Sequence, residues 1–183
     1  MARWIILLRG VNVSGKNKVP MAEWKAGLAA LGYTNIVTLQ NSGNAVLDTN
    51  SDRAALIHEV TGLMRERFGL EIPVYVIEQE SLRELLAQSP AWWGHEDKAI
   101  YDNLIFLLPP CTADELCEGL GEPHPTLERY PPVETRCSGA LTGRNTRKPT
   151  GGPGPRRSLP GNGSRYGQPV LCASWQRCNG VSP

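Results

Sequence analysis

The segment Asn35–Thr49, NIVTLQNSGNAVLDT, decides the fold. Residues 35–40 and 44–49 are two short runs rich in β-branched and aliphatic side chains, and Asn41-Ser42-Gly43 joins them. This pattern is typical of a tight β-hairpin, because Asn and Gly tolerate the backbone angles of a short turn. The two strands of a hairpin run in opposite directions, so the segment predicts an antiparallel sheet.

The residues before the hairpin predict one strand and one helix. Residues 3–9 contain an apolar run that indicates a buried strand, and a polar, glycine-containing loop follows from Gly10 to Val19. Pro20 suits the first position of a helix, and Gly32 suits its end. Apolar residues recur between them at helical spacing, at Met21, Trp24, Leu28 and Leu31.

The residues after the hairpin predict a second helix and a fourth strand. Ser51 or Asp52 can cap the helix, and residues 74–77 indicate the strand. The residues expected to point inward from the helix are Leu56, Val60, Leu63, Met64 and Phe68. The order β-α-β-β-α-β predicts an α+β fold. For residues 1–79 we expect the ferredoxin-like sandwich, in which both helices cover one face of an antiparallel sheet.

A second, incomplete pattern follows. Residues 80–100 are expected to form a linker, with a helix at 80–88 and a loop whose Trp92-Trp93 packs between domains. The next segment, 101–130, predicts a strand at 101–108 and a helix at 112–120 capped by Thr112. Because a strand followed by a helix also opens the first unit, we expect this segment to be the start of a second ferredoxin-like unit.

The composition changes abruptly after Tyr130. The first 130 residues contain 11 of the 19 Lys+Arg and 17 of the 18 Asp+Glu, whereas the last 53 contain eight bases and one acid. Gly and Pro together number 17 in each part, although the second part is much shorter. Such a basic segment buries too little apolar surface to offset its ordering entropy. Residues 131–183 are therefore predicted to be a disordered tail.

Two explanations of this tail stay open: a natural disordered segment, and translation in a shifted reading frame (a frameshift). If the codons from Val133 onward are read from their third base, the genetic code permits Gly-Asn-Ala-Val-Phe-Trp-Ser-Phe. The first four of these residues repeat Gly43–Val46, and one base lost near Pro131-Pro132 would produce the shift. We therefore assign no function to the tail, including its cysteines Cys137, Cys172 and Cys178.

The apolar runs and the cysteines indicate the cellular setting. Trp4–Leu8 is too short for the apolar region of a signal peptide, and no run approaches the length of a membrane span. Cys111 and Cys117, the cysteines before the composition change, lack the spacing of a metal site, so neither a metal nor a cofactor is expected. We expect a reducing, cytoplasmic location without membrane contact.

The loop after the first strand is the strongest candidate site. Gly10–Asn17 has the spacing G-x-x-x-x-G-K-N, but Asn17 replaces the Mg²⁺-binding hydroxyl of a true P-loop and Pro20 delays the helix. We expect a looser site for phosphate, a nucleotide or nucleic acid. The predicted ligand-binding residues are Arg9, Gly10, Asn12, Gly15, Lys16, Asn17 and Lys18. The alternative is a solvated loop in which Arg9 pairs with a nearby carboxylate.

The remaining residues favour a binding module over an enzyme. His58, His95 and His124 are scattered and form no Ser/His/Asp, Cys/His or paired-carboxylate pattern, so no catalytic residue is assigned. No aromatic residue is expected on the open sheet face, which argues against RNA recognition by base stacking. The strand residues expected there are Ile5, Leu7, Ile36, Thr38, Ala45 and Leu47. A protein-interaction module that forms a homodimer through this face is the alternative function.

Three segments resemble a known family. The run Leu7–Met21 resembles the opening of the bacterial family called domain of unknown function 1697, and Leu31–Ile36 and Gln40–Asn44 resemble its next motifs. The resemblance covers residues 3 to about 130 and implies an α+β protein with two ferredoxin-like halves. It implies no activity. Members of the family continue with an aromatic strand where this chain has its basic tail.

Overall fold

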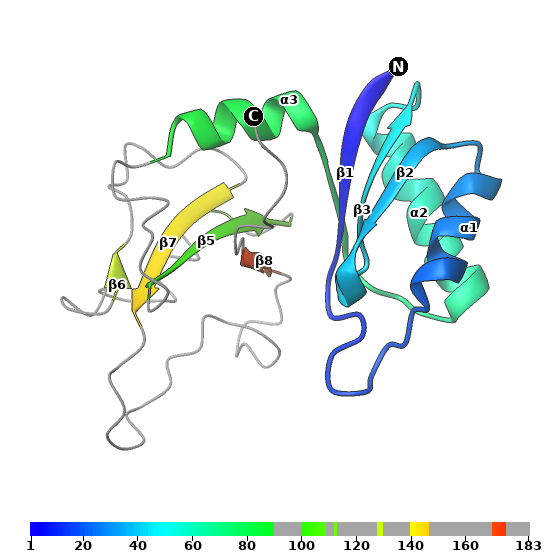
Figure 1. Ribbon diagram of the computed structural model, residues 1–183, viewed down its shortest axis with the longest axis horizontal. Helices are drawn as coiled ribbons and strands as arrows, with labels where there is room; N and C mark the ends of the chain where they lie inside the picture. The colour runs from blue at the N-terminus through cyan, green and yellow to red at the C-terminus, as the bar shows by residue number, and fades with distance from the viewer. Residues whose placement is uncertain (90–99, 109–111, 113–127, 130–139, 147–169, 175–183) are drawn as a thin grey trace. The chain divides into compact units, whose positions relative to one another are not determined.

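The computed structural model describes residues 1–89, 100–108, 112, 128–129, 140–146 and 170–174 (Figure 1). The chain divides into two compact units, Met1–Ala87 and Gln88–Pro183. The first unit extends beyond the predicted boundary at residue 79, because the helix expected to be a linker packs on the sheet of this unit.

The first unit has the predicted order of strands and helices. Its elements are β1 (Ala2–Leu8), α1 (Met21–Ala30), β2 (Thr34–Leu39), the 3-10 turn η1 (Gln40–Ser42), β3 (Asn44–Thr49), α2 (Arg53–Phe68), β4 (Val74–Glu78) and α3 (Gln79–Ala87). The four strands form one sheet in the order β2-β3-β1-β4, and every neighbouring pair is antiparallel. The predicted α+β class is therefore confirmed.

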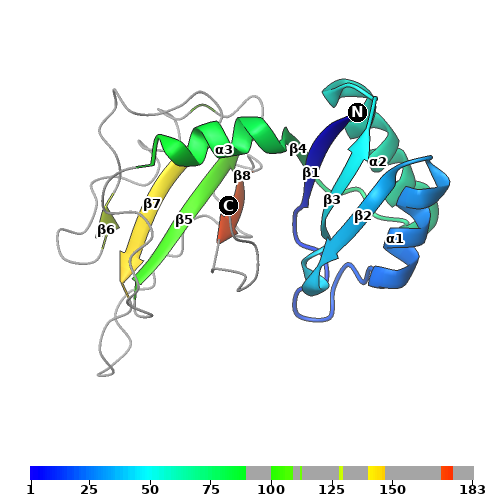
Figure 2. The same cartoon turned by 45° about the horizontal axis from the view of Figure 1, so that its top comes forward.

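The main core lies between α1, α2 and one face of the sheet, and Figure 2 shows both helices on the same side. The ring of Trp24 meets the ring of Phe68 edge-on at a centroid distance of 6.4 Å. The fully buried residues of this core include Ile6, Trp24, Leu28, Leu47, Leu56, Val60 and Met64. Leu31, the last residue of the predicted helical spacing, lies just past the end of α1 at Ala30 and is 39% exposed.

The ends of the two helices follow the local sequence. The carboxylate of Asp52 accepts a hydrogen bond from the backbone N–H of Ala55 at 2.8 Å, as expected for the cap of α2. Gly69 ends this helix in the left-handed conformation. Pro20 lies one position earlier than predicted, at the N-cap of α1, where its carbonyl accepts from the N–H of Trp24.

The register of the sheet corrects the predicted open face. Ile5 pairs with Val46, so odd-numbered residues of β1 share a face with even-numbered residues of β3. Ala45 and Leu47 consequently face the helices, and both are fully buried. Ile36 packs against the same core, and Thr38, which pairs with Ala45, lies on the same side. The prediction that these four residues lie on the open face is therefore wrong.

The face away from α1 and α2 carries an apolar row that crosses all four strands. Cross-strand pairing places Val37, Val46, Ile5 and Ile77 side by side in this row. The helix α3 contacts β1 and β4 and buries Leu82, whereas Val37 on the outer strand β2 is 48% exposed. This side of the sheet is thus apolar at its centre and exposed toward β2.

One aromatic residue, Tyr75, lies on this face, although the sequence predicts none there. Tyr75 pairs with Leu7, and its ring lies 5.1 Å from the guanidinium carbon of Arg53. It is 8% exposed, so little of its ring is left for stacking on a base. Burial raises the pKa of Tyr75, and the positive charge of Arg53 partly offsets this effect.

The second unit contains a four-stranded antiparallel sheet. Its strands are β5 (Ile100–Leu107), β6 (Glu128–Arg129), β7 (Ala140–Thr146) and β8 (Val170–Ser174), in the order β6-β7-β5-β8. The predicted strand at 101–108 is therefore present within one residue, and its residues 104–107 are buried.

The strands β7 and β8 correct the prediction that the whole of 131–183 is disordered. Both strands pair with β5, because the backbone N–H and C=O groups along each of its two edges need a partner strand. The helix expected at 112–120, the Trp92-Trp93 loop and the residues Cys111, Cys117, His95 and His124 lie outside the described residues, apart from Thr112.

Candidate functional site

The loop between β1 and α1 folds into a small β-hairpin. The backbone N–H of Lys16 donates to the carbonyl of Val13 at 3.0 Å, and these two residues form an isolated antiparallel bridge. Ser14 and Gly15 occupy the tip with φ angles of 51° and 76°. Positive φ at both central residues is what a type I′ turn requires. The predicted glycine loop is therefore a tight hairpin with a defined tip.

Two asparagine side chains hold the base of the hairpin. Asn12 Nδ2 donates to the carbonyls of Val19 at 3.0 Å and Asn41 at 2.9 Å, and Asn12 Oδ1 accepts from the N–H of Val19 at 2.9 Å. Asn17 Nδ2 donates to the carbonyl of Gly10 at 3.0 Å. These side-chain amides were expected to contact a ligand. Their hydrogen bonds are instead made within the structure that supports the loop.

The β2–β3 turn packs directly against this hairpin. Gly43 has a φ of 76°, and a Cβ at this position would lie 2.5 Å from Val11 Cγ2 and 3.1 Å from Leu8 Cδ1. Asn44 Oδ1 also accepts a hydrogen bond from the N–H of Leu8 at 3.3 Å. The two motifs therefore meet at one end of the sheet, and their Gly and Asn residues build that junction.

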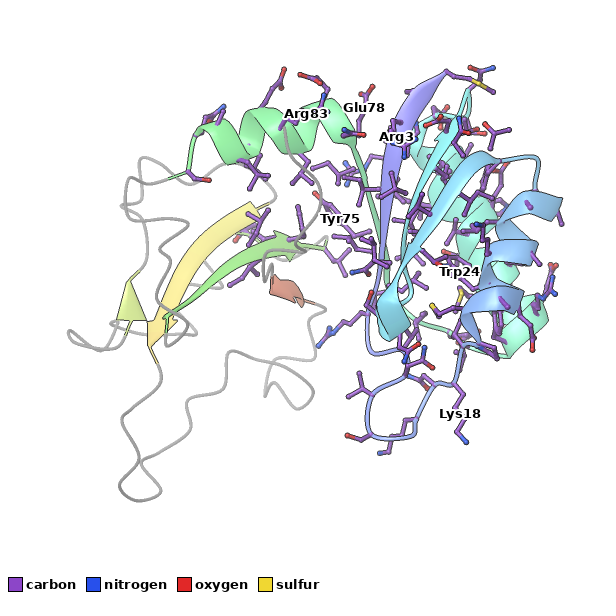
Figure 3. The ribbon with its side chains drawn as sticks, in the orientation of Figure 1. Arg3, Lys18, Trp24, Tyr75, Glu78 and Arg83 are labelled. Atoms are coloured by element: carbon purple, nitrogen blue, oxygen red, sulfur yellow. The ribbon has the colours of Figure 1, made fainter. Side chains whose placement is uncertain are left out.

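The hairpin presents positive charge to solvent. Arg9 is partly exposed and Lys16 and Lys18 are exposed, while residues 9–20 contain no Asp or Glu. Figure 3 shows Lys18 pointing away from the sheet. The ion pairs found between described residues lie elsewhere, and they are Arg3–Asp48 and Arg83–Glu80. Among the described residues, no carboxylate forms an ion pair with Arg9, as the alternative would require.

The hairpin differs from a P-loop in its path. A P-loop curls its backbone N–H groups around phosphate and leads directly into the first turn of a helix. Here the chain reverses at Ser14-Gly15, and α1 begins only after Pro20. Within the described residues, the backbone N–H groups of Ser14, Gly15 and Lys18 donate no hydrogen bond. The site therefore offers cations and free donors on a protruding turn, without a phosphate cradle.

The segment Leu31–Ile36, which resembles a family motif, also has a structural role. The hydroxyl of Tyr33 donates to the carboxylate of Glu59 on α2, and burial followed by this hydrogen bond raises the pKa of Tyr33. Asn35 Nδ2 donates to Asp48 at 2.6 Å, and Arg3 donates to the same carboxylate at 2.9 Å. The Asn35 hydrogen bond is the main cause that lowers the pKa of Asp48, and Arg3 adds to it.

Other candidate chemistry is sparse in the described residues. They contain no group of three or more His, Cys, Asp or Glu that could hold a metal ion. His58 is exposed on α2. No helix of the described ranges is long and apolar enough to cross a membrane.

The comparisons with known proteins identify a family. No curated protein matches the chain. The solved structure of a conserved bacterial protein from Streptococcus pneumoniae is similar, with a TM-score of 0.66 and 22% sequence identity, over 80% of this chain and 78% of that chain. At this identity the likeness shows the fold alone. The model of the family described as protein of unknown function (DUF1697) matches residues 1–136. This chain therefore belongs to the DUF1697 family.

Proposed function

We propose that this protein is a small binding module whose hairpin contacts an anionic ligand, namely phosphate, a nucleotide or nucleic acid. The observation that carries the proposal is the set of three cations, Arg9, Lys16 and Lys18, on a hairpin without an acidic residue and without an ion pair among the described residues. Cations held in this way attract anions and donate charge-assisted hydrogen bonds to them.

The rigidity of the hairpin supports the same function. Asn12 and Asn17 hydrogen-bond the loop to itself and to Asn41, and Gly43 packs against Val11 at its base. A loop already held in one conformation loses less entropy when a ligand binds. In this proposal Arg9, Lys16 and Lys18 contact the ligand, and the glycines and asparagines position them.

A binding titration at several salt concentrations tests the proposal. We expect the full chain to bind members of a panel of phosphate, nucleotides and RNA, and to bind them less well as salt is added. Exposed ion pairs contribute about 0.2–1 kcal/mol each, so Lys16→Ala with Lys18→Ala should weaken binding roughly 2- to 30-fold.

The matched control removes the same charge elsewhere. Lys25 on α1 and Arg83 on α3 are both exposed, so Lys25→Ala with Arg83→Ala lowers the net charge equally without touching the hairpin. The control should bind as the unaltered chain does. Binding of no member of the panel, or an equal loss in both double variants, would reject the proposal.

We further propose that the protein is built from two ferredoxin-like units. The order β2-β3-β1-β4, with a helix after β1 and another after β3, supports this assignment for the first unit. When strands are matched in chain order, β6-β7-β5-β8 repeats the same arrangement, which supports a second copy.

Two observations also bear on the basic tail after Tyr130. The family match ends at residue 136, close to the change in composition after Tyr130. The Gly-Asn-Ala-Val of the shifted reading, at residues 133–136, repeats Gly43–Val46, the end of the β2–β3 turn and the start of β3. We propose a shifted frame on these grounds. Sequencing the gene across the codons for Tyr130 to Val133 tests it, and an intact frame there would leave a natural tail.

A second candidate function follows from the sheet. The apolar row Val37, Val46, Ile5 and Ile77, with Val37 48% exposed, favours association of two copies through the face away from α1 and α2. Light scattering should then show a dimer that Lys16→Ala with Lys18→Ala leaves intact and Val37→Lys dissociates. A monomer at all concentrations would reject this candidate. Either function is proposed to operate in the bacterial cytoplasm.

A further inference from the structure

We infer that the anion bound by the hairpin is the sugar–phosphate backbone of a single-stranded nucleic acid, and not free phosphate or a mononucleotide. This inference rests on the proposed function, because it names the class of ligand for the same site. The shape of the hairpin, one exposed apolar side chain and the composition of the second unit support it.

The shape of the hairpin favours a long ligand. Small molecules bind in concave sites that bury most of their surface. Ser14 to Lys18 are all exposed around a tight turn, and the Nδ2 groups of Asn12 and Asn17, which could have surrounded a phosphate, donate to backbone carbonyls. A single phosphate would meet few groups on such a convex surface. A polymer can place successive phosphates against Arg9, Lys16 and Lys18 at once.

An exposed apolar residue lies beside the cations. Val13 is 50% exposed and is the cross-strand neighbour of Lys16. Free phosphate has no apolar surface that could cover this side chain, whereas a nucleic acid offers sugars and bases. In a duplex the base faces are stacked on each other, but in a single strand they are accessible. The position of exposed Val13 opposite Lys16 therefore favours the single strand.

The sheet does not supply base recognition. Tyr75, on the face away from α1 and α2, is 8% exposed and its ring is near Arg53. The side-chain amide of Asn12, which could read a base edge, is hydrogen-bonded through both Nδ2 and Oδ1, and Asn17 Nδ2 donates to the carbonyl of Gly10. Contacts to phosphates carry no sequence information, and every base offers a face to an apolar side chain. We therefore expect affinity that varies little with base sequence.

The fold itself does not require the basic hairpin. In the second unit, the sheet order of the first unit is repeated, but residues 108–127 between β5 and β6 contain no Lys or Arg. The segment after β1 is thus basic, whereas the segment after β5 carries neither Lys nor Arg. This contrast indicates that the cations of residues 9–18 serve a ligand and not the architecture of the sheet.

Fluorescence anisotropy of the full chain with a labelled oligothymidylate of about 12 nucleotides tests the inference. Single strands give a slope of log K against log salt of about −0.7 per phosphate contact, so three contacts predict about −2. Lys16→Ala with Lys18→Ala should bring the slope to about −0.7, and Lys25→Ala with Arg83→Ala should leave it unchanged. Val13→Ser should weaken binding about threefold with the same slope, because it removes apolar contact and no charge.

Competition experiments separate this inference from the proposed function. At equal phosphate concentration, thymidine monophosphate and inorganic phosphate should compete at least about tenfold less well than the unlabelled oligomer. Equal competition by either would overturn the inference and leave the proposed function standing. Tighter binding to duplex DNA or to phosphatidylserine vesicles would also overturn it. If neither phosphate, nucleotide nor oligomer binds, both the inference and the proposed function fail.

Discussion

A single methyl group at Gly43 tests whether the β2–β3 turn and the basic hairpin form one packed structure. Gly43 has a φ of 76°, and an added Cβ would lie 2.5 Å from Val11 Cγ2. Val11 is 3% exposed and Leu8, the next neighbour, is 5% exposed, so both belong to the core and have little room to move. The change Gly43→Ala therefore combines backbone strain with overpacking.

The two costs can be estimated separately. Placing Ala in the left-handed region costs roughly 1–2 kcal/mol. Forcing an extra methyl group into a packed core costs typically about 1–3 kcal/mol more. Gly15→Ala is the matched control, because Gly15 has the same φ of 76° with nothing within 4 Å of an added Cβ. The free energy of unfolding should fall by about 3 kcal/mol for Gly43→Ala and by about half as much for the control.

Equilibrium urea unfolding of the full chain, followed by far-UV circular dichroism, measures both values. Amide hydrogen exchange adds a local measurement, and the N–H groups of Asn12 and Val19 should exchange faster in Gly43→Ala because the hairpin loses its support. Equal losses of unfolding free energy in the two variants would refute the reasoning. The loss of unfolding free energy in Gly43→Ala would then come from backbone strain alone, without overpacking.

Two further changes test the polar groups that hold the motifs. Asn12→Ala removes the acceptor of the buried Val19 N–H, so the free energy of unfolding should fall by about 1–3 kcal/mol, and an unchanged urea midpoint would contradict this role. Asp48→Asn tests the lowered pKa of Asp48, which Asn35 and Arg3 cause by stabilising the carboxylate. A lowered pKa contributes stability above the ordinary value of 3.8 that is lost as the pH falls through the folded-state pKa. The urea midpoint of the unaltered chain should therefore fall more steeply on acidification below pH 3.8 than that of Asp48→Asn, and parallel pH profiles would contradict it.

Particular residues show how far local sequence rules reach. Local rules correctly predict that Asp52 caps α2 and that Gly43 closes the β2–β3 turn, because capping and turn formation involve residues only a few positions apart. Leu56, Val60 and Met64 are buried as predicted, because their spacing of four residues places them on one side of the helix. The basic loop was also recognisable, because charge and the absence of acids are properties of composition.

The amino-acid sequence by itself determined the order of strands and helices in the first unit, because hydrophobic periodicity, caps and turn residues act over short distances along the chain. The tertiary structure alone decided the register that pairs Ile5 with Val46, and hence turned Ala45 and Leu47 toward the helices. It also decided that Asn12 bonds to Val19 and Asn41, and that β7 and β8 pair with β5. Each of these outcomes depends on which segments meet in space, and hydrogen-bonding capacity alone does not specify a partner that is distant in sequence.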